Sequence, residues 1–293
     1  MRSLVPVLFL VVILAFLLPA VPAALKKKLR HRPALLFALP AFLAAAFCAV
    51  AMNMGALGLP LALLIVAYTL TPTVCIFLQG ADARAATWLD LAVILLLWLP
   101  IELNLGSAWI PRHAQGLLHT VAYGVALILA LVLCLGFRGF QGMKYHLPRR
   151  LMDFVHPLIA FALVAPILVL LGRALSFIPP FHFPENLSLP GAAKTFGLIF
   201  VATALPEEIL FRSLIQNWMM QKFGATTAVL VAASVLFGCA HLNNGPQPLP
   251  NWRYMILATI AGFAYGKVFQ RASSATASMA LHALVDATKH LFF

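Results

Sequence analysis

Acidic residues are scarce in this sequence. Only 8 of its 293 residues are Asp or Glu, and charged residues of all kinds make up 10% of the chain. Soluble domains carry roughly 25% charged and about 45–50% apolar residues, whereas 63% of this chain is apolar. A water-soluble globular domain is therefore excluded, and the composition predicts an integral, multi-pass membrane protein.

Cysteine is also rare, and its placement excludes a disulfide scaffold. The four cysteines lie in apolar runs without a CxxC spacing, as buried thiols that pack as small hydrophobes usually do. The excess of Lys and Arg gives a net charge of +12. In a multi-pass protein such an excess is typical of cytoplasmic loops and contact with anionic lipid headgroups. We expect the lipid bilayer as partner, no nucleic acid, and the plasma (inner) membrane if the source is prokaryotic.

The apolar runs predict an all-α fold, a helical bundle in the membrane. A bilayer core requires about 20 apolar residues per helix, and about ten spans, with eight to ten compatible, follow from this rule. The predicted spans are 4–24, 33–52, 57–79, 86–103, 117–137, 152–172, 195–220, 225–242, 254–270 and 274–292.

The first 25 residues resemble a signal peptide, because Ala20 to Ala24 offer small residues for cleavage. The basic cluster from Lys26 to Arg32 follows the apolar run, as in a stop-transfer segment, so we expect an uncleaved first span. A Pro-rich loop from Arg173 to Lys194 marks the predicted domain boundary. Residues 1–185 are predicted to form an amino-terminal scaffold of unassigned role, and residues 186–293 a separate carboxy-terminal domain.

The positions of the eight acids indicate where chemistry is concentrated. A charged side chain in hydrocarbon costs at least about 2.5–3.5 kcal/mol, so an acid there is a functional candidate. We expect Asp82, Asp153 and Glu185 to be solvated in loops or at span ends, and Asp90 and Glu102 to lie at the membrane interface. The functional candidates inside apolar segments are Glu207, Glu208 and Asp286, which share their region with His241 and His282.

The Glu207–Glu208 pair combines a paired and an unpaired acid. On a helix Glu208 and Arg212 are four residues apart, with the acid first, which favours an ion pair. Glu207 is rotated by about 100° and has no such partner, so it is the better candidate for proton transfer. Pro206 removes a backbone hydrogen bond at this point and is predicted to kink the helix.

His241 is predicted to lie close to Glu207. The turn near Lys222 to Gly224 lies about 16 residues after Glu207 and about 18 before His241, or roughly 24 and 27 Å along the two helices, so an antiparallel hairpin places them level. Phe237 and His241 share one helical face, as do His282 and Asp286. A joint site of Glu207 and His241 is therefore geometrically reasonable, and His282 with Asp286 forms a second pair in the same region.

Three motifs in this order resemble the CAAX protease and bacteriocin-processing family, also called CPBP or ABI, of intramembrane proteases. They are Glu-Glu-x-x-x-Arg from Glu207 to Arg212, Phe-x-x-x-His from Phe237 to His241, and His-x-x-x-Asp from His282 to Asp286. The resemblance covers roughly residues 190–293, and implies that residues 186–293 are the catalytic membrane domain. No family resemblance is found for residues 1–185.

The resemblance implies a glutamate-type endopeptidase that acts on a membrane-associated protein or peptide, lipidated or not. Glu207 and His241 would activate water, His282 and Asp286 would stabilise the oxyanion, and Glu208, Arg212 and Phe237 would support the site. No cofactor is implied. Prenyl-protein members usually have Asn at the position of Asp286, so we expect Asp286 to orient and charge His282 and do not assume a prenylated substrate.

Three alternatives follow from the same residues. A zinc enzyme would use Glu207, His241 and His282 as ligands, although no His-Glu-x-x-His pattern is present. A proton-coupled transporter would use the intramembrane acids and histidines as a relay, although the two chain halves show no internal repeat. A non-catalytic immunity or scaffold protein would retain the motifs without turnover. The oligomeric state does not follow from the sequence.

Overall fold

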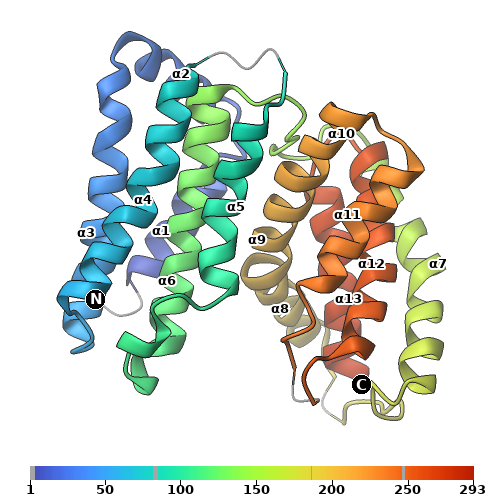
Figure 1. Cartoon of the computed structure of the whole chain (residues 1–293). Coiled ribbons are helices and arrows are strands. Elements are labelled where there is room, and N and C mark those ends of the chain that lie inside the picture. Colours follow the sequence, from blue (N-terminus) through green and yellow to red (C-terminus); the bar gives the residue numbers. More distant parts are fainter. Residues whose placement is uncertain (1–3, 82–84, 186, 246–247) are drawn as a thin grey trace. The chain divides into compact units, whose positions relative to one another are not determined.

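A computed structural model describes residues 4–81, 85–185, 187–245 and 248–293, and every regular element in these ranges is helical (Figure 1). The prediction of an all-α protein is therefore confirmed for the described part, from which Asp82 is absent. The chain divides into two compact units, Met1–Gly142 and Met143–Phe293. The predicted division of roles after residue 185 stays a prediction.

The helices of the amino-terminal unit are α1 (Leu4–Ala15), α2 (Ala20–His31), α3 (Ala38–Asn53), α4 (Leu59–Gln79), α5 (Trp88–Glu102) and α6 (Arg112–Ala130), with the short η1 (Pro33–Phe37) and η2 (Ser107–Trp109) and the π-helical η3 (Leu131–Arg138). Helix α6 packs against α1, α3 and α5, and α4 packs against α3 and α5.

Asp90 is buried inside this unit. Its side chain caps α5 by accepting hydrogen bonds from Thr87, and Arg138 Nε lies 3.2 Å from Asp90 Oδ1. Both charged side chains are buried. The interfacial position of Asp90 stays a prediction, and the structure adds a partner 48 residues away that compensates its charge.

In the carboxy-terminal unit, α12 packs against α11, α7 and α13 (Figure 1). A helical stretch runs from Leu189 to Phe223 and changes type along its length. The elements are α7 (Met152–Ala174), α8 (Leu189–Ile199), η4 (Phe200–Ala204), α9 (Leu205–Glu208), η5 (Ile209–Gln216), α10 (Asn217–Phe223), α11 (Thr227–Cys239), α12 (Trp252–Arg271) and α13 (Thr276–Phe292), with η4 and η5 π-helical.

Local signals mark where the helices around the site begin and end. Gly224 has a φ of +83° and ends α10, a conformation that a residue with a Cβ rarely adopts. The side chain of Thr226 then caps α11 by accepting a hydrogen bond from the amide of Val229. The side chain of Asn251 caps α12 by accepting one from the amide of Tyr254. The reversal predicted near Lys222 to Gly224 is therefore present.

The turn between α12 and α13 is held by two charged residues. Asp153 accepts hydrogen bonds from Ser273 and from the amides of Arg149 and Arg150, and it is buried. Lys144 Nζ donates to backbone carbonyls at the end of α12, among them Phe269 O at 2.7 Å. The prediction of a solvated Asp153 is wrong, since its partner at residue 273 is 120 positions away.

The predicted count of ten spans is not confirmed. Of the described helices, four are long and apolar enough to cross a membrane, or up to five if α1 and α2 form one broken span. α1 and α2 meet at 91°, next to Pro19, so the segment predicted as the span 4–24 is not one continuous helix. The segments predicted at 86–103 and 225–242 contain helices of only 15 and 13 residues. The apolar helices nevertheless indicate an integral membrane protein.

Candidate active site

The structure brings the predicted site residues together within the carboxy-terminal unit. Glu207 and Glu208 lie on α9, Arg212 on η5, and His282 and Asp286 on α13. Phe237 lies near the end of α11, and His241 follows that helix directly. Glu208, Arg212, His241 and His282 are all buried, whereas the Glu207 side chain is 25% exposed.

Glu207 faces both imidazoles. Its Oε2 atom lies 3.8 Å from His241 Nε2 and 3.9 Å from His282 Nε2. This oxygen is buried and has no hydrogen-bond partner among the described residues. Distances of this size are too long for direct hydrogen bonds but match the span of a bridging water. The approach of Glu207 to His241 agrees with the depth predicted from the hairpin.

The backbone fixes the tautomer of His241. Its Nδ1 atom lies 2.8 Å from Phe237 O, and a carbonyl oxygen can only accept. Nδ1 must therefore carry the hydrogen, which leaves Nε2 of the neutral ring as an acceptor directed at Glu207. Glu207 Oε2 and His241 Nε2, 3.8 Å apart, are then both acceptors, so the pair can accept hydrogen bonds from the O–H groups of one bound molecule.

Glu208 connects two other site residues. Arg212 Nε donates to Glu208 Oε2 at 3.1 Å, which confirms the pair predicted from the spacing. The second oxygen, Oε1, lies 3.2 Å from His282 Nδ1, a contact that the sequence did not suggest. Arg212 also donates to Gln216 and lies 4.8 Å above the Phe237 ring. Glu208 thus holds the guanidinium on one side and the imidazole of His282 on the other.

His282 has carboxylates at both ring nitrogens. Nδ1 faces Glu208, and Nε2 lies 3.5 Å from Asp286 Oδ2, as the spacing of four residues predicts. Ionised carboxylates only accept hydrogen bonds, so the ring form that serves both sides is the imidazolium, with a hydrogen on each nitrogen. This geometry makes His282 a donor and His241 an acceptor around the same Glu207 oxygen.

Pro206 lies between two π-helical segments, η4 and η5. Proline has no backbone N–H, and the wider π-helical turns accommodate the interrupted hydrogen-bond ladder. Residues 189–223 therefore stay helical through Pro206. The predicted kink at Pro206 stays a prediction; the structure shows an α-helical segment, Leu205–Glu208, with π-helix on each side of it.

Two tyrosines of α12 complete the surroundings of the imidazoles. Tyr265 stacks on His282, with ring centroids 4.6 Å apart, and Tyr254 meets His241 edge-on at 4.6 Å. Phe237 lies 4.7 Å from His241 and 5.8 Å from His282. The sequence analysis identified Phe237 but missed the tyrosines. Their spacing of 11 residues, about three helical turns, puts them on one face and is the signal that could have identified them.

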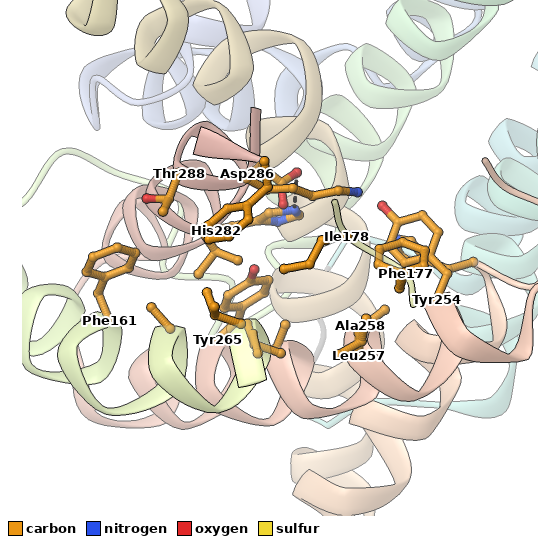
Figure 2. A pocket seen from close by; sticks show the side chains of 18 of the residues that line it. Phe161, Phe177, Ile178, Tyr254, Leu257, Ala258, Tyr265, His282, Asp286 and Thr288 are labelled. Atoms are coloured by element: carbon orange, nitrogen blue, oxygen red, sulfur yellow. Dashed lines mark ion pairs between the residues drawn. The ribbon is translucent and has the colours of Figure 1, made fainter. Parts of the chain in front are cut away.

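A cavity of about 80 Å³ adjoins this cluster (Figure 2). His241, His282 and Asp286 line it together with apolar residues of α7 and α12. Among the described residues, no group of three or more His, Cys, Asp or Glu side chains is arranged to hold a metal ion. The arrangement offers an unpaired carboxylate, an acceptor imidazole and a donor imidazole next to a space for a ligand.

Comparison with protein families finds a match for the region that contains all these residues. Residues 190–288 match the family model described as Type II CAAX prenyl endopeptidase Rce1-like. Searches of curated proteins and of solved structures found no match to the chain. Residues 190–288 thus form an Rce1-like domain, consistent with the CAAX protease and bacteriocin-processing family.

Proposed function

We propose that this protein is a glutamate-type intramembrane endopeptidase that hydrolyses a peptide bond of a membrane-associated protein or peptide. The observation that carries the proposal is the buried, unpartnered Oε2 atom of Glu207 with an imidazole nitrogen at 3.8 and at 3.9 Å. The match of residues 190–288 to a family of endopeptidases supports the same reaction class.

In the proposed reaction, a water molecule donates hydrogen bonds to Glu207 and to Nε2 of His241. Glu207 removes a proton as the water oxygen attacks the carbonyl carbon of the peptide bond. A carboxylate surrounded by protein loses part of its hydration and is a stronger base than in water. The proton then passes to the leaving amine as the carbon–nitrogen bond breaks, so the carboxylate is regenerated.

His282 is proposed to stabilise the oxyanion. A hydrogen-bond donor aimed at the developing negative charge typically accounts for about 10²–10³ in kcat. The donor is the Nε2 hydrogen, which the oxyanion would share with Asp286, whose oxygen lies at the long distance of 3.5 Å from Nε2. The carboxylate of Asp286 keeps the imidazole charged and oriented. Glu208 and Arg212, both fully buried, hold the opposite nitrogen of His282 in place.

The substrate is proposed to be a membrane-associated peptide, with or without a lipid. The family name refers to prenyl endopeptidases, but Asp286 stands where such enzymes usually have Asn, according to the sequence resemblance. An ionised carboxylate cannot donate a hydrogen bond to an oxyanion. This chemistry favours an indirect role for Asp286 through His282.

Comparative mass spectrometry of membrane peptides tests the proposal. Membranes containing the wild-type chain are compared with membranes containing Glu207→Gln, which keeps the shape of the side chain and removes the base. Cleaved peptides should appear with the wild type and be absent with Glu207→Gln and with His241→Ala. Glu185→Gln, a substitution of an exposed acid in the same unit, serves as the matched control and should retain full activity.

The same preparations distinguish the alternative functions. Turnover that persists in Glu207→Gln would contradict the proposed mechanism. Absence of turnover in the wild type, together with proton flux in proteoliposomes that depends on Glu207, would favour the transporter. Absence of both activities would favour the scaffold or immunity protein.

A further inference from the structure

Helix α2 has an apolar side and a basic side. Leu29 is buried, and α2 packs against η3 and η1. The basic residues at the carboxy-terminal end of α2 are Lys26, Lys27, Lys28, Arg30 and, directly after it, Arg32. Lys27, Lys28 and Arg32 are exposed, and their side chains form no ion pair with any residue that the structure describes. These three residues, here called the basic face, present positive charge that no described residue compensates.

The packing of α2 places it at one end of a membrane-spanning segment. Together α6 and η3 form a segment of 27 residues that is long and apolar enough to cross a membrane. α1 packs against α6, whereas α2 packs against η3, the last part of this segment. A Cβ at Gly136 would lie 2.6 Å from Leu25, and a Cβ at Gly139 would meet the side chain of Lys26. α2 therefore lies where the segment ends and the bilayer surface begins.

The direction of the chain supports the same position. α2 turns by 91° from α1, and the apolar segment Pro33–Asn53, also long enough to cross a membrane, begins directly after Arg32. The 12 residues of α2 extend about 18 Å, too short for a hydrocarbon core of about 30 Å. A short helix at right angles to its predecessor, next to the start of a spanning segment, fits the surface of the bilayer and not its interior.

We propose that α2 lies along the membrane surface and that its basic face binds the phosphate groups of anionic phospholipids. Basic amphipathic helices lie in this way in the plane of the interface. The aliphatic stems of Lys and Arg let their charged ends reach the headgroups. Each basic residue near an anionic surface strengthens binding by roughly fivefold. The inference goes beyond the proposed peptidase function and is independent of it, because it concerns the amino-terminal unit.

Photo-crosslinking to lipid headgroups tests the proposal in the full-length protein. The protein is reconstituted in phosphatidylcholine vesicles that contain a small fraction of phosphatidylglycerol with a diazirine in its headgroup. Phosphatidylcholine with the same diazirine serves as the reference. We expect the phosphatidylglycerol probe to label peptides from residues 20–32 at least about 5-fold more than the reference does. Inorganic phosphate should reduce this labelling no more than sodium chloride at the same ionic strength, because both salts only screen the charges.

Three double variants separate the basic face from charge in general. Lys27→Gln/Lys28→Gln removes two charges and should lower the labelling of residues 20–32 at least about 10-fold, whereas Lys27→Arg/Lys28→Arg keeps both charges and should stay within about 2-fold. Arg112→Gln/Lys194→Gln removes two exposed charges outside α2 and should also leave this labelling within about 2-fold. Size-exclusion chromatography in detergent checks that each variant folds like the wild type.

The outcomes decide between lipid and soluble ligands. Equal labelling by the two lipids, or by the wild type and Lys27→Gln/Lys28→Gln, overturns the proposal. An equal loss in Arg112→Gln/Lys194→Gln would show a general effect of charge and also overturns it. Displacement by inorganic phosphate beyond the effect of sodium chloride would identify a soluble anion as the ligand. Absence of labelling by both lipids, with protection of Lys27 and Lys28 from acetylation by heparin, would place α2 in water against a soluble polyanion; both results overturn the binding of lipid.

Discussion

Removal of the guanidinium of Arg212 should strongly destabilise the carboxy-terminal unit. Arg212 and Glu208 are fully buried, and their Nε and Oε2 atoms lie 3.1 Å apart. Loss of one partner of a buried pair leaves an uncompensated charge and costs about 3–5 kcal/mol. In Arg212→Leu, Glu208 keeps its contact with His282 at 3.2 Å, so we expect the lower end, about 3 kcal/mol.

A double-mutant cycle measures this pair directly. The free energy of unfolding in mixed micelles is compared for the wild type, Arg212→Leu, Glu208→Gln and the double variant. The double variant has no uncompensated charge at this position, so it should be more stable than the sum of the single changes predicts, by about 1–3 kcal/mol. A cost below about 1 kcal/mol for Arg212→Leu, or strict additivity, would refute the reasoning.

Three further results are expected. A Cβ at Gly262 would lie 2.8 Å from the Phe237 ring, so Gly262→Ala should destabilise the protein by up to about 2 kcal/mol. A Cβ at Gly197 would meet no atom within 4 Å, so Gly197→Ala should stabilise its helix by about 0.5–1 kcal/mol. Thermal unfolding in detergent compares the two variants. Asp286→Asn should lower kcat about 5- to 10-fold, because a hydrogen bond from a charged donor is stronger by about 1 kcal/mol than one from a neutral donor. An unchanged kcat would contradict the role of Asp286 in keeping His282 charged. Exhaustive chelation should leave cleavage unchanged, and loss of activity restored by Zn²⁺ would support the metal-dependent alternative with Glu207, His241 and His282 as ligands.

The fold was predictable to the extent that it depends on neighbouring residues. Apolar runs of about 20 residues identify helices because the bilayer requires internal backbone hydrogen bonds. The same rule predicted ten spans, whereas four of the described helices, or up to five with the bent pair, are long and apolar enough to cross a membrane. It counts apolar residues and does not detect the 91° bend between α1 and α2 or the 13-residue length of α11.

The candidate site was predictable where helix geometry alone sets the contact. Glu208 with Arg212 and His282 with Asp286 are pairs four residues apart, and the rise per residue brings Glu207 level with His241. The contact between Glu208 and His282 joins residues 74 positions apart, and no local pattern encodes it. Its consequence, an imidazole with a carboxylate at each nitrogen, is therefore a result of the structure.

The sequence by itself determined the class of the molecule and pointed to the candidate site residues. Composition specifies the membrane, and the scarcity of acids makes Glu207, Glu208 and Asp286 stand out. Only the tertiary structure decided how these residues face one another and what surrounds them. Packing of α7, α11, α12 and α13 directs the two imidazoles, adds Tyr254 and Tyr265, and forms the cavity of about 80 Å³. The physical reason is that a cavity is the space left by side chains from distant segments, and its shape depends on how they pack.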